Sequence, residues 1–367
     1  MHFALDTRIF YRMCRSLSEE YEVHLLAVHP QNELREGVHI HAFRRFHSRK
    51  RRIAIGWLLA FFRAIAINAR IYHLHDPELI PCGLLLRLLG KKVILDIHEN
   101  IAEDIFDKPW IRNQQRIYRV FHFFERLACK YFYIILAETS YERRYKKLAK
   151  QCVTVLNFCE TDFFKPFVKT SGRKGLNLFY IGIVLENRGI LQIIDAMRAL
   201  QLEGYNPHFH CVGELYSDLE RKILALSYYP EIEPNLHFHG RMPLEQGYAM
   251  SMDMDIGLCI IWPMSNSIES YPTKLFEYMS VGLPIVCSGF ELYRQVVEGH
   301  HCGTCVDPMD SLDLKNAIKA IHTDVEKSEL MSKSGPPAVL ENYNWESQKP
   351  VLSGVYRELS NNLNKKR

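Results

Sequence analysis

The sequence predicts an α/β fold made of two doubly wound domains that face a cleft. Short apolar runs of strand length alternate with segments of helical periodicity along nearly all of its 367 residues. A polar stretch with Gly and Pro interrupts this alternation at 159–175, and a second series follows. The chain is also more than twice as long as the roughly 150 residues of a typical domain. Open parallel sheets bind ligands beyond the carboxyl ends of their strands, so the loops there are the first candidates for a site.

The first half contains a series of expected strands and helices without an opening strand. Asp6 or Thr7 suits the N-cap of the first helix, but no strand-like run stands ahead of them. A doubly wound sheet normally has its first strand near the centre. The N-terminal domain therefore either lacks its first strand or begins upstream. The strands are expected at 22–28, 38–42, 70–74, 92–96, 132–137 and 152–156, and the helices at 7–19, 53–67, 79–89, 109–130 and 140–148.

The second half repeats the alternation. We expect Rossmann-like domains at 1–160 and 176–345, a linker at 161–175, and a C-terminal helix with its tail at 346–367. The strands of the second domain are expected at 176–181, 208–212, 236–239, 255–261, 284–287 and 303–306, and its helices at 188–202, 215–226, 243–251, 273–280, 290–297 and 310–321.

The net charge and the positions of the basic residues indicate which kinds of partner the chain can bind. A net charge of +4 is too small to indicate nucleic acid, so no nucleic-acid partner is expected. A basic and aromatic run at 44–52 precedes an apolar stretch at 53–67, which Arg63 interrupts. That stretch is shorter than the roughly 20 residues of a bilayer-spanning helix. Residues 44–62 therefore either form a peripheral contact with an anionic membrane surface or a solvated loop before a core helix.

The ten cysteines are scattered, mostly within apolar strand-like runs. Such residues are typical of buried free thiols in a reducing compartment, and no signal peptide is recognised, so a cytoplasmic protein is expected. Cys302 and Cys305 form one C-x-x-C pair, which would make half a zinc site or a redox pair. No second pair at ligand spacing lies near it in the sequence, so we expect no metal there.

A helix start with features of a phosphate site lies between 265 and 289. Pro272 suits the entry to a helix, and Gly282 suits its end. A helix N-terminus offers free N–H groups and a partial positive charge, to which Lys274 adds a full charge. A cation there is unfavourable by about a few tenths of a kcal/mol unless an anionic ligand offsets it. Glu277 lies on the same face and can accept two ribose hydroxyls; alternatively, the two residues form a surface ion pair.

A second candidate loop follows the strand expected at 176–181. Gly182 ends that strand and lets the backbone approach a ligand closely. Arg188 begins the next helix and can offer a forked set of donors to a diphosphate. Taken alone, this loop is no more specific than a lone glycine-rich loop.

Together these segments resemble a known family. Residues 271–286 look like the donor-site motif of GT-B glycosyltransferases, and more narrowly of the retaining glycosyltransferase family 4, or glycosyl transferases group 1. The resemblance covers nearly the whole chain in the order of that family; the motifs are specific together and not singly. The others are Asp6-Thr-Arg-Ile-Phe, His75-Asp-Pro-Glu-Leu-Ile-Pro, Asp96-Ile-His-Glu-Asn, Tyr180-Ile-Gly and Glu186-Asn-Arg-Gly.

The resemblance implies roles for individual residues. Glu277 matches the glutamate that holds the ribose of the nucleotide, and Glu269 matches the first glutamate of an E-x7-E pair, which contacts the donor sugar. Sequences with Pro-Thr-Lys often carry another residue at that first position. The family often has an Arg where Ile183 follows the strand-end glycine here. The other matches are Lys274 and Arg188, which would grip the diphosphate; His98, near the donor sugar; Gly182, Gly213 and Gly240, in loops around the nucleotide; and Asp6 and Arg8, which would bind the acceptor or the diphosphate, or equally fix the first helix.

The resemblance also implies a function. The N-terminal domain would bind a glycan or lipid-linked acceptor and the C-terminal domain a UDP- or GDP-type nucleotide sugar, with the last helix crossing back to the first domain. The activity would be a retaining hexosyl transfer in cell-surface polysaccharide synthesis, with no metal and no other cofactor. Asp253 and Asp255 have the letters of a metal-binding D-x-D but straddle a helix–strand junction. Two alternatives stay open: a UDP-sugar 2-epimerase of the same fold, and a non-catalytic GT-B-like subunit of a polysaccharide-assembly complex.

Overall fold

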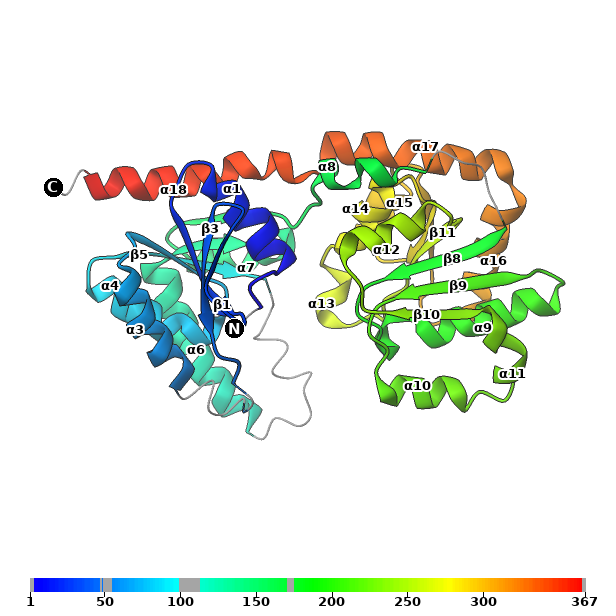
Figure 1. The fold of residues 1–367 in the computed structure, drawn as a ribbon, viewed down its shortest axis with the longest axis horizontal. Helices are drawn as coiled ribbons and strands as arrows, with labels where there is room; N and C mark the ends of the chain where they lie inside the picture. The colour runs from blue at the N-terminus through cyan, green and yellow to red at the C-terminus, as the bar shows by residue number, and fades with distance from the viewer. Residues whose placement is uncertain (1–2, 47, 49–54, 99–112, 170–174, 365–367) are drawn as a thin grey trace. The chain divides into compact units, whose positions relative to one another are not determined.

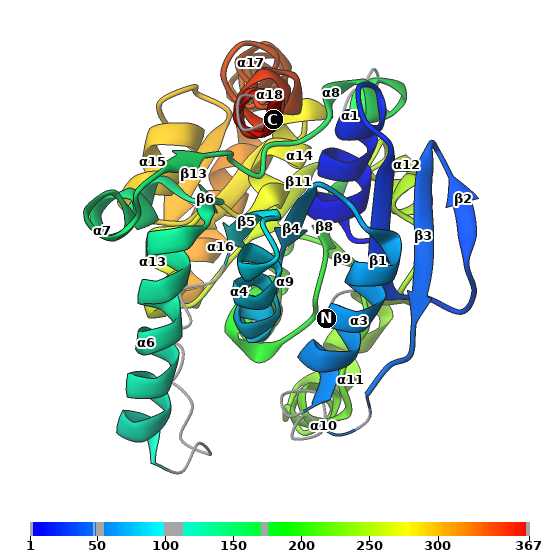
Figure 2. The same ribbon diagram turned by 90° about the vertical axis from the view of Figure 1, so that its left-hand side faces the viewer.

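The chain forms two compact units, each with parallel strands and covering helices (Figures 1 and 2). The first unit comprises Met1–Asn157 together with Trp345–Arg367, and the second comprises Phe158–Asn344. The predicted α/β class with parallel sheets is confirmed. The computed structural model describes residues 3–46, 48, 55–98, 113–169 and 175–364.

The first unit contains two separate sheets, with the strand orders β1-β3-β2 and β4-β5-β6-β7. All neighbouring strands are parallel except β2, which runs antiparallel to β3. Ahead of the first helix, Phe3 makes one isolated parallel bridge with Val28, and no strand precedes that helix from Phe3 onward. The strands are β1 (Val23–Val28), β2 (Glu33–Arg35), β3 (Val38–Phe43), β4 (Ile71–Leu74), β5 (Lys92–Ile97), β6 (Tyr133–Leu136) and β7 (Cys152–Thr154).

Helices cover both faces of the four-stranded sheet. Val93 and Leu95 of β5 pack in a cluster with residues of α3, α4 and α6. Ile94, between them, packs in a second cluster with Met13 of η1 and Leu352 of α18. Successive residues of one strand thus face two helical layers, as expected for a buried parallel sheet. The helices are η1 (Thr7–Cys14, a π-type helix), α1 (Arg15–Ser18), α3 (Trp57–Ile67), η3 (Pro77–Leu79), α4 (Ile80–Leu88), α6 (Gln114–Tyr131), η4 (Thr139–Tyr141), α7 (Glu142–Leu148), η8 (Trp345–Ser347) and α18 (Lys349–Asn364).

The second unit has one six-stranded parallel sheet with the order β10-β9-β8-β11-β12-β13. The strand order reverses between β8 and β11, which is the position where sheets of this type bind ligands. Every residue of β11 and β12 is buried, because helices cover both faces (Figure 1). The strands are β8 (Leu176–Ile181), β9 (Pro207–Val212), β10 (Leu236–Gly240), β11 (Ile256–Cys259), β12 (Ile285–Ser288) and β13 (Gly303–Val306).

Six helices of the second unit, α9, α10, α12, α14, α15 and α16, fall where the sequence predicts them, whereas α8, α11, α13 and α17 do not. The stretch expected as a linker at 161–175 starts with α8 and η5, which belong to this unit. The helices are α8 (Thr161–Phe164), η5 (Lys165–Phe167), η6 (Glu186–Arg188), α9 (Ile190–Leu202), α10 (Ser217–Leu224), α11 (Tyr229–Ile232), η7 (Glu233–Asn235), α12 (Leu244–Ser251), α13 (Ser265–Ile268), α14 (Thr273–Ser280), α15 (Glu291–Val297), α16 (Ser311–Thr323) and α17 (Val325–Asn342).

The longest of the helices that the sequence does not predict is α17. It contains Pro336 and Pro337 in its interior, and such residues usually end a helix. A Cβ atom on Gly335 would lie 2.8 Å from the carbonyl oxygen of Met279, so glycine lets α17 approach the backbone of α14 directly. Packing against α14 therefore outweighs the loss of backbone donors at the two prolines.

The cysteines are free thiols, as predicted, and all except Cys152 are buried. The Cys302 Sγ atom donates to the Val297 carbonyl oxygen at 3.3 Å, and the Cys305 Sγ atom lies 3.4 Å from that of Cys287. Burial raises the pKa of the Cys302 thiol to about 12. The C-x-x-C pair is therefore part of the core of the second unit.

Stacked histidines on β9 and β10 make the stability of the second unit depend on pH. Burial first, and then the neighbouring histidines, lower the pKa of His210 from 6.5 to about 4. The unfolded chain therefore binds more protons than the folded chain between these values, so the free energy of unfolding falls as the pH drops from about 6.5 towards 4. The four side chains are His208, His210, His237 and His239, with an Nδ1–Nε2 distance of 3.2 Å between His210 and His239.

We expect His210→Gln to flatten this pH dependence. Urea unfolding at roughly pH 7.5, 5.5 and 4.5 measures the free energy of unfolding above, within and near the lower end of this pH range. His300→Gln is the matched control, because the His300 ring makes one hydrogen bond to the Tyr343 hydroxyl and lies outside the stack. Equal loss of stability on acidification in wild type and His210→Gln would contradict the prediction.

Candidate functional site

Three glycines form the backbone surface at the carboxyl ends of β8, β9 and β10. Gly182, Gly213 and Gly240 have φ angles of 135°, 156° and 69°, which L side chains rarely adopt. The Gly213 N–H donates to the Gly240 carbonyl oxygen at 2.9 Å, and the Gly182 N–H donates to that of Val212 at 2.9 Å. A Cβ atom on Gly213 would lie only 1.9 Å from the Gly182 oxygen. The structure therefore brings together all three glycines that the sequence analysis selects.

Lys274 lies beside this glycine surface. It is in the first turn of α14, which follows Pro272. Its Nζ atom lies 4.0 Å from the centre of the Tyr180 ring, and 3.0 Å from the position of a Cβ atom on Gly182. Within the described residues it forms no ion pair with a carboxylate. The aromatic face thus holds a cation whose charge has no anionic partner at the start of a helix.

The positive charges of Arg188 and Lys274 both lower the pKa of one buried thiol, that of Cys259. Arg188 ends η6, the turn after β8, and is half-buried. Burial raises the pKa of Cys259 at the end of β11 to about 11, while the charges of Lys274 and Arg188 oppose the rise. Gly189 follows with a φ of 68°, and a Cβ atom there would lie 2.4 Å from Ile260 Cγ2. Close packing of this turn on β11 therefore keeps Arg188 at the reversal point of the strand order.

Glu277 is a buried carboxylate rather than half of a surface pair. It is 7% exposed, and the Tyr248 hydroxyl donates to its Oε2 atom at 2.5 Å. Burial, and then the charge of Glu277, raise the pKa of Tyr248 well above its ordinary value, so the phenol stays a donor. No ion pair joins Glu277 to Lys274 in the described part of the chain. The alternative of a Lys–Glu surface pair therefore does not describe α14.

Glu269 stands apart from these residues. It is exposed and follows the four-residue helix α13, at whose end it has a φ of −109°. Among the described residues it makes no hydrogen bond or ion pair with Lys274 or Glu277. The structure thus places Glu277 in a fixed position and leaves Glu269 on the surface of its loop.

The first unit has a buried carboxylate, Asp96, near the carboxyl end of β5. Arg8 Nε donates to Asp96 Oδ2 at 2.9 Å and Arg8 Nη2 donates to Oδ1 at 2.8 Å. The Nδ1 atoms of His75 and His98 lie 3.1 Å and 3.7 Å from Oδ2. Burial alone would raise the pKa of Asp96, but the charge and hydrogen bonds of Arg8 hold it well below its usual range. The carboxylate stays ionised beside two imidazoles.

The two candidates at the start of the chain hold the first helix. Asp6 caps η1, since its carboxylate accepts from the N–H groups of Arg8 and Ile9 at 2.9 Å each, which confirms the N-cap prediction. Arg8 is 6% exposed and also donates to the Val155 carbonyl oxygen at 3.0 Å. Asp6 therefore caps η1, and the contacts of Arg8 fasten η1 to the end of β5.

Three residues that the sequence analysis does not select as site residues lie next to candidate residues in the structure. Asp96 sits beside His98, Tyr248 holds Glu277, and Tyr180 lies under Lys274. A charged residue within the apolar run 93–97 is a signal for Asp96. Tyr248 and Glu277 are 29 positions apart, and no spacing rule links them.

The D-x-D pair Asp253 and Asp255 has the spacing of metal ligands, but Asp255 already has protein partners. Asp255 is 2% exposed, accepts from the Asn177 N–H at 2.9 Å and pairs with Lys169 at 3.3 Å. The D-x-D letters at 253–255 therefore mark a structural carboxylate. Of the described part of the chain, only His73, His75 and Asp96 are grouped closely enough to ligate an ion, and Arg8 already neutralises Asp96.

Comparisons with known proteins match part of the chain to a family. Residues 163–336 match the family model described as "Glycosyl transferases group 1". The chain is 26% identical over 152 residues to the "Putative colanic acid biosynthesis glycosyltransferase WcaL" of Salmonella typhimurium, which covers 41% of this chain and 37% of the relative. The protein of that name from Escherichia coli is 24% identical over 158 residues, which is 43% of this chain and 38% of the relative. The chain thus matches about two fifths of the length of these curated relatives.

Solved structures share the fold over most of the chain. Sucrose-phosphate synthase from Thermosynechococcus elongatus has a TM-score of 0.76 at 15% identity, over 96% of this chain and 92% of that one. Anabaena Alr3699/HepE in complex with UDP has a TM-score of 0.69 at 13% identity, over 94% of each chain. WaaG, a glycosyltransferase involved in lipopolysaccharide biosynthesis, has a TM-score of 0.68 at 15% identity, over 96% of this chain and 97% of that one. The fold is therefore GT-B, and within it residues 163–336 match the family model of glycosyl transferases group 1.

Proposed function

We propose that this protein is a glycosyltransferase that moves a sugar from a UDP- or GDP-type nucleotide sugar to a hydroxyl group of a glycan or lipid-linked acceptor. One observation carries the proposal. In the segment that matches the family, Lys274 has no carboxylate partner among the described residues, lies at the start of α14 beside the Gly182 loop, and is followed by the buried Glu277. A free cation, helix N–H groups and an oriented carboxylate are the groups that a nucleoside diphosphate needs.

The proposed chemistry is electrostatic. Transfer separates charge, because the sugar ring becomes positive while the diphosphate departs with negative charge. Lys274, Arg188 and the N–H groups of α14 would stabilise the leaving diphosphate, and Glu277 would accept hydrogen bonds from the ribose hydroxyls. His98 would lie near the donor sugar, and its Nδ1 atom is 3.7 Å from the ionised Asp96 carboxylate. We propose that the transfer retains the anomeric configuration and needs no metal, since these cations supply the positive charge.

Names of similar proteins support the wider setting of the proposal. HepE of Anabaena is described in complexes with UDP and with UDP-glucose, and the WcaL relatives are named for colanic acid biosynthesis. A nucleotide-sugar donor and a role in polysaccharide synthesis would fit these names. The free thiols of the core would fit the reducing cytoplasm.

A nucleotide-release assay tests the proposed activity. The full chain is offered UDP- and GDP-sugars with glycan and lipid-linked acceptors, and the nucleotide released with acceptor is measured. Release that depends on acceptor is expected. Conversion of a UDP-sugar to its 2-epimer without acceptor would favour the epimerase instead. Nucleotide binding without any turnover across the screen would favour the non-catalytic subunit.

Glu277→Gln is expected to weaken donor binding about tenfold or more. The carboxylate has two acceptor oxygens for a ribose diol, whereas the amide keeps one, and charged hydrogen bonds contribute about 1.5–3 kcal/mol. Titration calorimetry with the nucleoside diphosphate measures the change. Glu329→Gln on α17 is the matched control, because that side chain is 61% exposed and pairs with Lys333. Equal affinity in wild type and Glu277→Gln would remove Glu277 from the donor site.

We further propose that the face of α3 contacts an anionic membrane surface next to the basic run. Leu59, Phe62 and Ile65 are 45%, 60% and 40% exposed on one side of α3, while Ala60 and Ala64 face the core. This pattern suits a helix lying in the interface, and none of the described helices is long and apolar enough to cross a bilayer. Residues 47 and 49–52 of the basic run, and 53–54 of the apolar stretch, lie outside the described residues.

Phe62→Ser is expected to reduce liposome binding at least about fivefold, since a large apolar group no longer enters the interface. Co-sedimentation with phosphatidylserine vesicles at low and high salt measures it, and charge reversal at 49–52 should remove the salt dependence. The control is Leu330→Ser on α17, a leucine with a similar exposure of 59% in the second unit. If liposome binding changes with neither salt, nor charge reversal, nor Phe62→Ser, the face of α3 is not the membrane contact.

A further inference from the structure

Tyr248 is a fully buried tyrosine of α12 that contacts the candidate donor site through its hydroxyl. Its exposed fraction is 0%, and the hydroxyl donates to Glu277 Oε2 at 2.5 Å. Glu277 lies on α14, the helix whose first turn carries Lys274. A side chain without exposed surface cannot touch a ligand, so any effect of Tyr248 on a bound nucleotide must pass through Glu277.

Packing fixes the Tyr248 ring. The Phe164 ring of α8 meets it edge to face, with 4.8 Å between the ring centres and 89° between the ring planes. The Phe179 ring of β8 lies 6.3 Å away at 65°. A Cβ atom on Gly247 would lie 2.6 Å from Ile181 Cδ1, so the glycine lets α12 lie close against the end of β8. Neighbouring rings and a closely packed helix therefore fix the position of the hydroxyl.

The two carboxylate oxygens of Glu277 have different surroundings. Oε2 accepts the hydrogen bond from Tyr248. Oε1 accepts none in the described part of the chain, and it is not among the fully buried side-chain atoms there that lack a partner, so it stays accessible. An ionised carboxylate oxygen has two lone pairs. Oε1 therefore keeps both of its acceptor sites for the hydroxyls of a ribose.

We propose that Tyr248 is a positioning residue of the donor site, which anchors Oε2 so that Oε1 distinguishes a ribose from a 2′-deoxyribose nucleotide. This inference rests on the proposed function, because it takes Glu277 as the ribose ligand. A carboxylate that is already oriented loses little freedom when the ribose hydroxyls bind. A 2′-deoxyribose leaves the oriented oxygen without one donor, and a site built for a hydroxyl group rejects the analogue that lacks it.

Loss of the phenol would leave the charge of Glu277 unchanged and remove its orientation. Tyr248→Phe deletes one hydroxyl, and the ring that packs against Phe164 and Phe179 remains. The terminal torsion of a glutamate is broad, so the released carboxylate can turn in its site. The ligand must then order the carboxylate itself, which lowers both the affinity for ribose and the preference for it.

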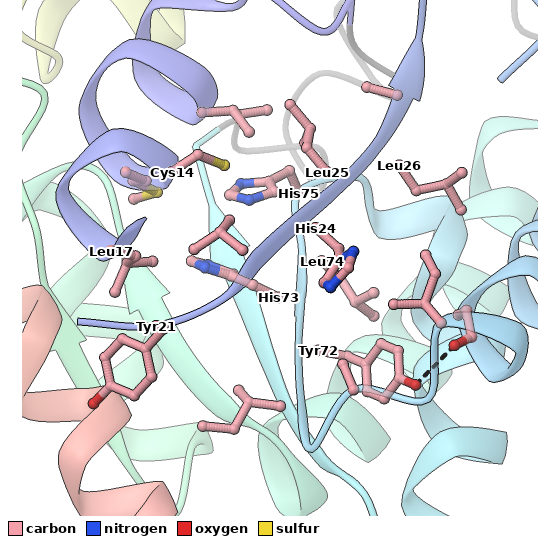
Figure 3. A pocket seen from close by; sticks show the side chains of 18 of the residues that line it. Cys14, Leu17, Tyr21, His24, Leu25, Leu26, Tyr72, His73, Leu74 and His75 are labelled. Atoms are coloured by element: carbon pink, nitrogen blue, oxygen red, sulfur yellow. Dashed lines mark hydrogen bonds between the residues drawn. The ribbon is translucent and has the colours of Figure 1, made fainter. Parts of the chain in front are cut away.

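A groove in the first unit provides a check on where a nucleotide binds. It has a volume of about 710 Å³ and lies between residues of β1 and β4 (Figure 3). Among the described residues that line it, only Arg70 carries a permanent positive charge, so it suits a diphosphate poorly. Tyr72 lines this groove, and its hydroxyl donates to the Ala64 carbonyl oxygen at 2.8 Å. Tyr72→Phe therefore changes the groove and leaves Tyr248 intact.

Titration calorimetry on the full chain tests the proposal, with UDP and GDP each compared with its 2′-deoxy form. Tyr248→Phe is measured alone and together with Glu277→Gln. Tyr145→Phe is the matched control, because Tyr145 is also buried and its hydroxyl donates to the buried Glu125 at 2.6 Å in the first unit. Tyr72→Phe is the control for the groove. Urea unfolding establishes that each variant is folded.

Tyr248→Phe is expected to weaken binding of UDP or GDP about fivefold or more, and to reduce the preference for the ribose form by a similar factor. The same change added to Glu277→Gln should have an effect of less than about twofold, because the oriented carboxylate is already absent. Tyr145→Phe and Tyr72→Phe should bind the nucleotides as the wild type does.

An unchanged ribose preference in folded Tyr248→Phe would overturn the positioning role and leave the proposed function in place. An equal loss of affinity with Glu277 and with Gln at that position would do the same, since Tyr248 would then not act through the carboxylate. Affinity lost in Tyr72→Phe and kept in Tyr248→Phe would place the nucleotide in the groove and overturn both. A wild-type chain that binds neither UDP nor GDP would overturn the proposed function and, with it, this role.

Discussion

Replacing Lys274 by Ala is expected to lower the turnover of donor sugar about 10²–10³-fold, the usual cost of removing one stabiliser of developing charge. The Nζ atom lies over the Tyr180 ring at 4.0 Å and beside the Gly182 loop, so a cation is held ready where α14 begins. Negative charge grows on the diphosphate as the bond to the sugar breaks. The effect should therefore fall on kcat more than on KM.

The experiment compares Lys274→Ala with two other variants in the nucleotide-release assay. Lys274→Arg keeps the charge and should recover part of the rate. Lys333→Ala on α17 removes an exposed lysine, 77% exposed and paired with Glu329, and should leave kcat unchanged. Unfolding curves establish that each variant is folded. A folded Lys274→Ala protein with the kcat of wild type would show that the proposed donor site is wrong.

Replacing Arg8 by Leu is expected to destabilise the first unit by about 3–5 kcal/mol, because it leaves the buried Asp96 carboxylate without the permanent positive charge of its guanidinium partner. The two side chains are almost fully buried, with exposures of 7% and 0%, and are joined by two hydrogen bonds. Replacing both residues by Leu should cost less than the single change, since no charge then stays buried. Urea unfolding of the two single variants and the double variant gives the coupling energy.

The pH dependence of this effect has a defined sign. Arg8 holds the Asp96 pKa well below its usual range, so the pair stabilises the fold above the unfolded pKa of Asp, and this is lost as the pH falls through the folded pKa. The deficit of Arg8→Leu should therefore shrink in acid. Arg221→Leu is the control, because Arg221 and Asp218 are 76% and 85% exposed, and such pairs contribute less than about 1 kcal/mol. If Arg8→Leu lowers the free energy of unfolding no more than Arg221→Leu does, the prediction for the buried pair is wrong.

The sequence predicts most strands of the second unit well because strands such as β8, β11 and β12 are buried on both faces. Runs such as 176–181 and 285–288 are apolar at nearly every position, and a turn or glycine closes each one. The same local signals place Lys274 at the start of α14 and Asp6 at the N-cap of η1. Local chemistry along the chain is sufficient for these features, because capping and strand burial involve neighbours in sequence.

Contacts between distant residues decide the rest. The turn-like Gly335-Pro336-Pro337 lies inside α17 because α14 is close enough to require the glycine. Glu269 and Glu277 both fit an E-x7-E spacing, yet only Glu277 is buried, because Tyr248 of α12 comes near it through the fold. Spacing alone gives no account of that difference.

The sequence by itself determined the α/β class, the order of the strands along the chain, and the set of loops that could hold a ligand. Only the tertiary structure decided which side chains share an environment: Lys274 with Tyr180, Glu277 with Tyr248, and Arg8 with Asp96. It also decided that two strand edges of the first unit border an apolar groove. The physical reason is that periodicity and capping are local, whereas burial, pKa and strand pairing depend on atoms that the fold brings together.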